Sequence, residues 1–211
     1  MVRIMAHQHI VLDLETLGTE PGCPILSIGA CAFDLDYDNF RVFYRKIHLA
    51  YQPTDKISVD TLSWWMEQDR AAQAAAWIEG EDAENYYAAL QLFGIWVDSI
   101  KKITGGAGIT IWGNSSSFDN EILRAAYKHC GVEAPWTFRE DRDFRTLRAL
   151  YKEKVPEPEF IGIRHHAKYD AMHEAKWLKL ILQRMKAEES AWRCQENARQ
   201  ESAYAALITS A

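Results

Sequence analysis

Two carboxylates lie two residues apart at the end of an apolar stretch near the start of the chain. Residues 10–18 have the sequence IVLDLETLG, which predicts a buried strand that ends in a glycine turn. Side chains alternate along a strand, so Asp13 and Glu15 project from one face while Leu12 and Leu14 project from the other. Neighbouring carboxylates that lose hydration repel each other, and a cation between them relieves the repulsion. The pair therefore indicates a divalent metal site.

Two further acids lie where predicted helices begin. Asp119 follows a strand and the polar turn at residues 113–117, and it has an ordinary structural explanation, because a carboxylate in the first turn of a helix is stabilised by the helix dipole. Ser116 and Asp119 also have a spacing like that of a capping box. Residues 164–171, with the sequence RHHAKYDA, place two histidines before Asp170. Asp170 has the same capping explanation, and either histidine could be a surface residue. The combination of the three sites is what indicates chemistry.

The predicted elements place these acids at strand ends and helix starts. Three strands, the first in residues 10–18 and the others at 25–33 and 40–47, form an antiparallel meander, and helices then alternate with strands. This order predicts an α/β protein with a mixed sheet and helices on both faces. Residues 60–68 predict a short aromatic helix capped by Asp60 or Thr61. The other predicted elements are a helix at 81–102 with a stop at 104–106, a strand at 109–112, a helix at 118–130, a strand running into a helix at 142–150, and a helix at 169–186.

The bulk composition is that of a soluble globular protein. The 211 residues are 48% hydrophobic and 26% charged, which suits one core with appendages. The apolar stretches are too short to span a bilayer and the N-terminus lacks a signal-peptide pattern, so we expect a cytoplasmic protein without a membrane partner. The net charge of −6 argues against a broad non-specific grip on long duplexes. The four cysteines lack paired metal spacing and are expected to be reduced structural thiols.

The order of the motifs resembles a known nuclease superfamily. Asp-x-Glu, then Asp, then His-x-Ala-x-x-Asp is similar to the DEDD superfamily of 3′→5′ exonucleases, in its histidine-containing DEDDh branch, which has a ribonuclease H-like fold. Asp13 and Glu15 match the first motif, Asp119 the second, and His165 with Asp170 the third. The resemblance covers roughly residues 9 to 182, and each motif lies at the expected strand or helix end.

Three shorter runs narrow the resemblance. Trp64-Trp65, the residues Trp112-Gly113-Asn114 before the second motif, and the sequence DFRTL at 143–147 look like phage- and prophage-type 3′→5′ exonucleases, the exodeoxyribonuclease VIII-like group. A related bacterial exoribonuclease group shares these runs. The choice between DNA and RNA therefore stays open.

The residue types suit a hard cation. Oxygen ligands without paired cysteines or clustered histidines favour Mg²⁺ or Mn²⁺ over zinc. Two such ions, about 3.5–4 Å apart, would clamp the scissile phosphate. The resemblance implies that Asp13 bridges both ions and that Glu15 and Asp170 hold the water-activating one. It also implies that Asp119 supports the second ion.

The resemblance further implies a general base and substrate contacts. Only His165 satisfies the His-x-Ala-x-x-Asp spacing, so we expect it to take the proton from the attacking water and expect His166 to be a neighbour at the rim. Leu17 is implied to wedge against the terminal base, and two tryptophans could form a stacking wall. The predicted substrate-binding residues are Thr16, Leu17, Gly18, Trp64, Trp65, Asn114, Ser117 and Phe118.

Several of these side chains have structural alternatives. Trp65 and Phe118 could be core residues, because large aromatic side chains on helices are usually buried. Asp143 and Arg145 could close the strand–helix junction with an ion pair. Glu174, one helical turn after the last motif, is expected to be a solvated acid rather than a further ligand.

The leading functional hypothesis is a metal-dependent exonuclease that releases nucleoside 5′-monophosphates from the 3′ end of single-stranded DNA. An RNA 3′-end trimmer is the close alternative. A non-catalytic nucleic-acid-binding or polymerase-docking module is disfavoured because the four acids and His165 are all present, and an RNase H-type endonuclease or transposase leaves the His-x-Ala-x-x-Asp element unexplained. We expect an exonuclease domain at residues 1–187 and a helical appendage at 188–211 that packs on its own domain or supports a homodimer.

Overall fold

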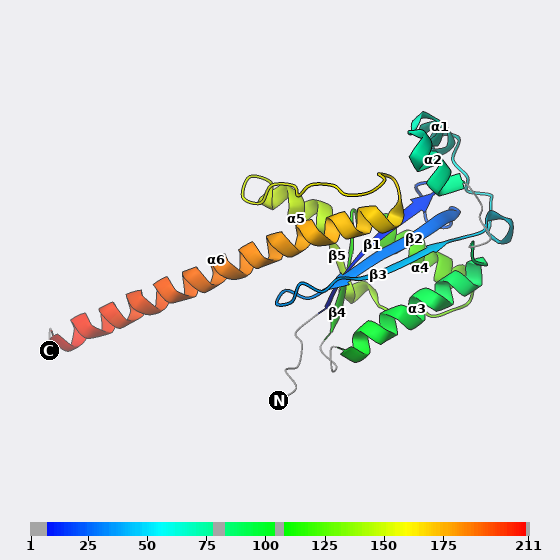
Figure 1. Ribbon diagram of the computed structural model, residues 1–211. Helices are drawn as coiled ribbons and strands as arrows, with labels where there is room; N and C mark the ends of the chain where they lie inside the picture. Colours follow the sequence, from blue (N-terminus) through cyan, green and yellow to red (C-terminus); the bar gives the residue numbers. More distant parts are fainter. Residues whose placement is uncertain (1–7, 78–82, 104–107, 210–211) are drawn as a thin grey trace.

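A five-stranded mixed sheet forms the centre of the protein (Figure 1). The structure is a computed structural model that describes residues 8–77, 83–103 and 108–209. The strand order is β3-β2-β1-β4-β5, with β1 antiparallel to β2 and parallel to β4. The predicted sheet of mixed direction is therefore confirmed. The strands are β1 (Gln8–Thr16), β2 (Ile25–Phe33), β3 (Arg41–Lys46), β4 (Ile109–Gly113) and β5 (Asp141–Asp143).

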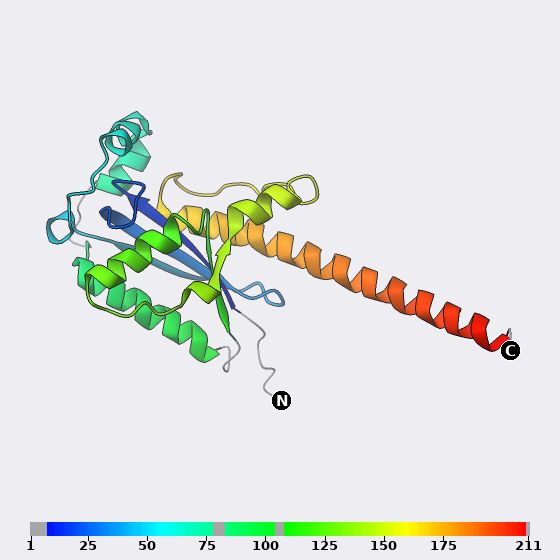
Figure 2. The ribbon, with the colours of Figure 1, turned by 180° about the vertical axis from the view of Figure 1, so that it is seen from behind.

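Helices cover both faces of the sheet, as Figures 1 and 2 show from opposite sides. One face packs against α3 and α4, and the other packs against α5 and the first part of α6. Helices α1 and α2 form a small unit beyond the carboxyl end of β1 (Figure 1). The helices are α1 (Val59–Glu67), α2 (Arg70–Trp77), α3 (Tyr86–Ile103), α4 (Asp119–His129), α5 (Phe144–Tyr151) and α6 (Ala167–Thr209), with short 3-10 turns at Leu49–Tyr51 and Phe138–Glu140.

The central strand β1 separates the two cores by alternation. Ile10, Leu12 and Leu14 are buried in the cluster that contains residues of α3 and α4. Val11 faces the opposite way and joins the cluster with residues of α6. By the same period of two, Asp13 and Glu15 lie on the face that α6 covers. The backbone pattern of one strand thus turns both carboxylates towards the helix that carries Asp170.

The first turn of α6 lies directly on the backbone of β2. A Cβ atom added to Gly29 would come within 2.1 Å of the carbonyl carbon of Ala167, which is far inside van der Waals contact. Only a glycine lets the helix start this close to the strand. Because Asp170 follows Ala167 by one turn, the position of its carboxylate depends on this contact.

Several element boundaries differ from the sequence predictions. Ser58, not Asp60 or Thr61, caps α1, because its hydroxyl accepts the amide of Thr61 at 3.3 Å. Helix α2 was not predicted. The predicted helix over 81–102 starts only at Tyr86, and residues 81–82 and the predicted stop at 104–106 lie outside the described residues.

The predicted C-terminal appendage is the continuation of α6. The helix runs without a break through the expected boundary at residue 187 and continues to Thr209, so the helical prediction is confirmed. At Glu188 it still bonds Tyr151 and Lys154, and beyond that point it projects away from the sheet (Figures 1 and 2). Trp192 on this part is 62% exposed. The described side chains from residue 189 to 201 are therefore largely exposed, and the use of this part in a homodimer stays a prediction.

Among the described helices, the 43-residue α6 included, none combines the length and the apolar character that crossing a bilayer requires.

The close contact at Gly29 predicts a measurable packing effect. We expect Gly29→Ala to lower stability by about 1–3 kcal/mol, because the added methyl group must displace the start of α6. Thermal unfolding followed by circular dichroism would measure this as a lower Tm. Gly94→Ala is the matched control: its Cβ would lie 3.7 Å from the Tyr127 hydroxyl, so we expect a gain of about 0.5–1 kcal/mol. An unchanged Tm for Gly29→Ala would contradict the contact.

Candidate functional site

A cavity of about 580 Å³ opens at the carboxyl end of β1. Its walls come from β1, helix α1, the turn before α4, and the starts of α5 and α6. The described residues that line it include six carboxylates against one arginine or lysine side chain, Arg145. Such a wall attracts cations and needs them before it can hold a phosphate. The six acids are Asp13, Glu15, Asp60, Asp119, Asp170 and Glu174.

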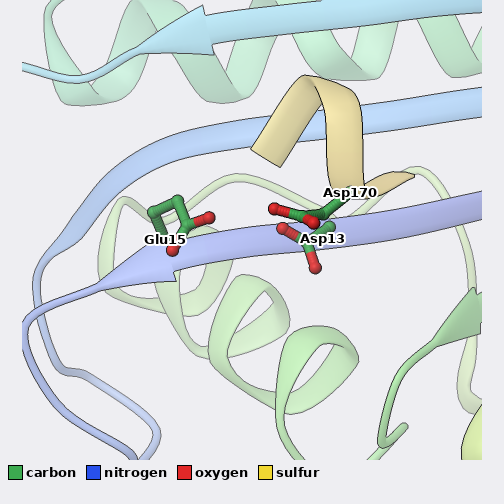
Figure 3. Close-up of side chains that lie close together, drawn as sticks. All are labelled: Asp13, Glu15 and Asp170. Atoms are coloured by element: carbon green, nitrogen blue, oxygen red, sulfur yellow. The ribbon is translucent and has the colours of Figure 1, made fainter. Parts of the chain in front are cut away.

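Three of these carboxylates form a tight group. Asp13 and Glu15 from β1 and Asp170 from α6 each offer an oxygen, and these three oxygens all lie within 4.8 Å of one another. Figure 3 shows the three side chains turned towards a common space. Oxygen donors at this spacing fit a hard divalent cation such as Mg²⁺ or Mn²⁺. The first and third sequence motifs are therefore brought together as predicted.

The electrostatics of the group also favour a cation. Burial raises the pKa of Asp13 well above its usual value, and the charges of Glu15 and Asp119 raise it further. Burial and the charge of Asp170 raise the pKa of Glu15 in the same way. Burial raises the pKa of Asp170, although the amide of His166, which donates to its Oδ2 at 2.9 Å, acts in the opposite direction. Without a cation, these acids are therefore driven to hold protons.

Asp119 is held by the backbone instead of capping its own helix. The parallel pairing of β1 with β4 ends at Leu12 and Gly113. The next amide on that side, from Leu14, donates to Asp119 Oδ1 at 3.1 Å, and the amide of Asn114 donates to Oδ2 at 3.0 Å. Burial raises the pKa of Asp119 to about 7 despite these donors. Asp119 is thus fixed beside the tight group, in the same cavity.

The two adjacent histidines lie in different places. His165 lines the cavity and has a left-handed backbone with φ of 59°, the one positive φ among the described non-glycine residues. The ring of His166 packs between Tyr44 at 4.5 Å and Tyr169 at 4.8 Å between centroids. Burial lowers the pKa of His166. Of the two histidines, His165 therefore lines the cavity with the acids and His166 does not.

The tryptophan pair has two different roles. Trp65 is 1% exposed, and its indole N–H donates to the Thr16 carbonyl oxygen at 2.9 Å, which docks α1 on the end of β1. The alternative that Trp65 is a core residue is therefore confirmed. Trp64 is 39% exposed, and its ring meets the His165 ring edge-on at 4.9 Å between centroids. Both tryptophans line the cavity, and Trp64 is the exposed one of the two.

The structure separates the other predicted substrate contacts into two groups. Thr16, Gly18, Asn114 and Phe118 line the cavity, although Phe118 also packs in part against the core. Leu17 does not line it: its side chain is 2% exposed and packs with Leu26 and Trp65. Ser117 is exposed, and its hydroxyl pairs with that of Ser115 at 2.8 Å. The wedge role for Leu17 is therefore corrected to a packing role, and Ser117 lies outside the cavity wall.

Two sequence interpretations at α5 and α6 were wrong. Asp143 does not pair with Arg145, because it caps α5 by accepting the Thr146 amide at 2.7 Å, while Arg145 donates to the Asn114 carbonyl oxygen at 2.7 Å. Arg145 thus becomes part of the cavity wall. Glu174 is not solvated but 6% exposed, and it also lines the cavity. Glu174 follows Asp170 by four residues and so lies on the same helix face, and this spacing could have indicated its place in the cavity.

A protein-family model matches most of the chain. Residues 8–182 match the model of the 3'-5' exoribonuclease Rv2179c-like domain. The chain belongs to this family. The match covers all three motifs and ends just before α6 leaves the sheet. A comparison with curated proteins finds no match.

Solved structures share the fold of the family member described here. Cell-death related nuclease 4 (CRN-4) is 15% identical with a TM-score of 0.56, over 87% of this chain and 65% of that chain. This chain thus spans less than two thirds of its length. The nuclease domain of 3'hExo, a DEDDh family member bound to rAMP, is 12% identical with a TM-score of 0.54, over 84% of this chain and 92% of that one. The predicted ribonuclease H-like fold is confirmed.

The chain thus belongs to a family whose model describes a 3'-5' exoribonuclease domain, and its cavity groups acids that could hold a divalent cation. The narrower phage-type grouping stays a prediction.

The raised pKa values predict a pH-dependent response to Mn²⁺. In the cation-free protein, the stability contributed by Asp119 is present below the unfolded value of 3.8 and is lost as pH rises towards about 7, because only the unfolded state ionises freely. A cation binds the ionised acids, so we expect Mn²⁺ at a hundredfold excess over Kd to raise Tm by about 5–10 °C at pH 8. The increase at pH 5 should be clearly smaller, since protons compete with the cation. Differential scanning fluorimetry with an EDTA reference would measure both; equal shifts would contradict the prediction.

Proposed function

We propose that the domain removes nucleoside 5′-monophosphates from the 3′ end of single-stranded RNA, with two divalent cations and His165 as the general base. The observation that carries this proposal is the grouping of Asp13, Glu15 and Asp170 oxygens within 4.8 Å, in the cavity that His165 also lines. Phosphodiester hydrolysis needs charge neutralisation at the phosphate and a base for the water, and this cavity offers residues for both.

The acids divide the task of holding the cations. Asp13, Glu15 and Asp170 would hold the cation beside His165, and Asp119, fixed by two amides, would support a second one. When bound, the cations neutralise the scissile phosphate and supply the Lewis acidity that the chain lacks. Because β1 and α6 hold the acids on rigid backbone, the cavity needs little rearrangement to bind them.

His165 is positioned to accept a proton near the acids. Its left-handed backbone turns the ring into the cavity, and the edge of Trp64 restricts that ring from the other side. An imidazole can take a proton from water and pass it on as a general base. The neighbouring His166 is confined between two tyrosines and does not line the cavity. This contrast supports the assignment of the base to His165.

The charge of the cavity suits a strand end and not a long duplex. With six carboxylates and one guanidinium on the described wall, the phosphate is held through cations, and Arg145 can meet one further phosphate. A volume of about 580 Å³ suits a terminal nucleotide whose base lies against Trp64. These features support single-stranded 3′ ends as substrates.

The family description favours RNA, since the matching model is that of an exoribonuclease domain. The solved 3'hExo nuclease domain, which has the same fold, binds a ribonucleotide, rAMP. Single-stranded DNA is the second candidate, because the runs Trp64-Trp65 and Trp112-Gly113-Asn114 resemble phage-type exodeoxyribonucleases.

A degradation assay tests this function. RNA and DNA oligonucleotides of equal sequence, labelled at the 5′ end, should shorten stepwise from the 3′ end with Mn²⁺ or Mg²⁺, RNA faster. Asp13→Ala should lower the rate by more than about a hundredfold, because losing even a supporting partner of a metal site costs about 10–100-fold. Asp55→Ala, at an exposed acid outside this cavity, is the control.

Three results would change the proposal. Full activity in EDTA, or in Asp13→Ala, would refute it. Faster loss of DNA would favour the second candidate. Cleavage of a circular single strand would indicate an endonuclease instead.

The exposed face of Trp64 predicts a binding effect. Trp64→Ala should raise KM by about 5- to 150-fold, because base–aromatic stacking contributes about 1–3 kcal/mol per base. It should also lower kcat, since the edge contact that restricts His165 is lost. Trp192→Ala, at a tryptophan that is 62% exposed on the projecting part of α6, should leave both constants unchanged. Steady-state kinetics on one oligonucleotide would compare the three proteins, and an unchanged KM in Trp64→Ala would rule out stacking there.

A further inference from the structure

Glu174 and Asn114 leave two buried oxygens without a partner at the wall of the cavity. Glu174, on α6, is 6% exposed, and its Oε1 accepts the Asn114 side-chain amide at 2.6 Å. Glu174 Oε2 and Asn114 Oδ1 are both buried and have no hydrogen-bond donor among the described residues. Both residues line the cavity. Buried acceptors without donors are costly, so this pair requires an explanation outside the protein's own hydrogen bonds.

The surroundings of Glu174 do not favour a carboxylate. The charges of Asp119 and Asp170 raise the pKa of Glu174, and the charge of Glu174 raises the pKa of Asp13. Arg148 is the cation that offsets part of this charge, and its guanidinium lies over the rings of Phe144 and Trp177 at 5.6 and 5.3 Å.

A purely structural role would not need an acid at this position. A glutamine has nearly the same shape and would fill the same space without adding repulsion. The carboxylate at position 174 is therefore better explained by a positively charged ligand.

We propose that Glu174 is a fifth carboxylate of the cation site, one that acts through water. Its Oε2 and the Asn114 Oδ1 accept hydrogen bonds from water carried by a hydrated divalent cation, and its charge adds to the attraction for that cation. Mg²⁺ and similar ions keep several waters when proteins bind them, and those waters are strong donors. Glu174 is thus a positioning residue rather than a direct ligand, since the tight group consists of Asp13, Glu15 and Asp170.

The location of the pair identifies which side of the cavity it serves. The backbone amide of Asn114 donates to Asp119 Oδ2, and its side chain donates to Glu174. Asn114 therefore links Asp119 and Glu174 in one hydrogen-bonded unit. The inference rests on the proposed function, in which this cavity binds divalent cations. Of the two proposed cations, the unit of Asp119, Asn114 and Glu174 would hold the one beside Asp119.

Calorimetric titration with Mn²⁺ alone, without nucleic acid, tests the inference. We expect Glu174→Gln to weaken Mn²⁺ binding by about 10–100-fold, the usual cost of removing a partner that supports metal ligands. Glu201→Gln, the same substitution at an exposed position of α6, should bind like the wild type. The Tm of cation-free Glu174→Gln should equal or exceed that of the wild type, because a repelled charge is removed. Asn114→Ala should also weaken binding, and it provides a second measurement if the first variant folds poorly.

The outcomes separate this inference from the proposed function. Wild-type Mn²⁺ affinity in Glu174→Gln would overturn the inference even if the wild-type protein degrades RNA. Weaker Mn²⁺ binding in Glu174→Gln, together with a wild-type protein that degrades neither RNA nor DNA, would uphold the inference and refute the proposed function.

Discussion

The mutual repulsion of buried carboxylates at the end of β1 is the constraint on which the site depends. Burial and neighbouring charges raise the pKa of Asp13 and Glu15, and the fold holds Asp170 and Asp119 beside them. Against these acids, the described cavity wall carries one arginine or lysine side chain, Arg145, and the imidazole of His165. A divalent cation removes this repulsion at once, so the energy that destabilises the cation-free protein becomes affinity for the metal.

The repulsion can contribute to cation affinity only because the acids cannot move apart. β1 is the central strand, and its alternation fixes Asp13 and Glu15 on the face of α6. The start of α6 is pressed onto Gly29, and backbone amides fix the carboxylates of Asp170 and Asp119. Each acid is therefore held by backbone geometry and not by a flexible partner, which is the condition for a preorganised metal site.

The sequence predicted those parts of the site that depend on local periodicity. Asp13 and Glu15 share a face because strands have a period of two, a rule that needs no knowledge of the rest of the fold. The cap at Ser58 and the burial of Trp65 depend on where α1 docks, which is a tertiary fact. Glu174 looked like a solvated acid, because an exposed helix face and one that covers a cavity have the same pattern of acids in a single sequence.

The small helical unit beyond β1 belongs to the chemistry as much as to the scaffold. Trp65 ties α1 to the Thr16 carbonyl oxygen, immediately after the two acids of β1. The ring of the adjacent Trp64 thereby meets the ring of His165, a residue far along the chain whose left-handed backbone conformation is not eased by a glycine. A strained histidine between a ring and an acidic wall has few alternative rotamers, and such strain persists where the surrounding structure enforces it. The unit of α1 and α2 therefore contacts the proposed base through Trp64, although it contributes no acid to the tight group.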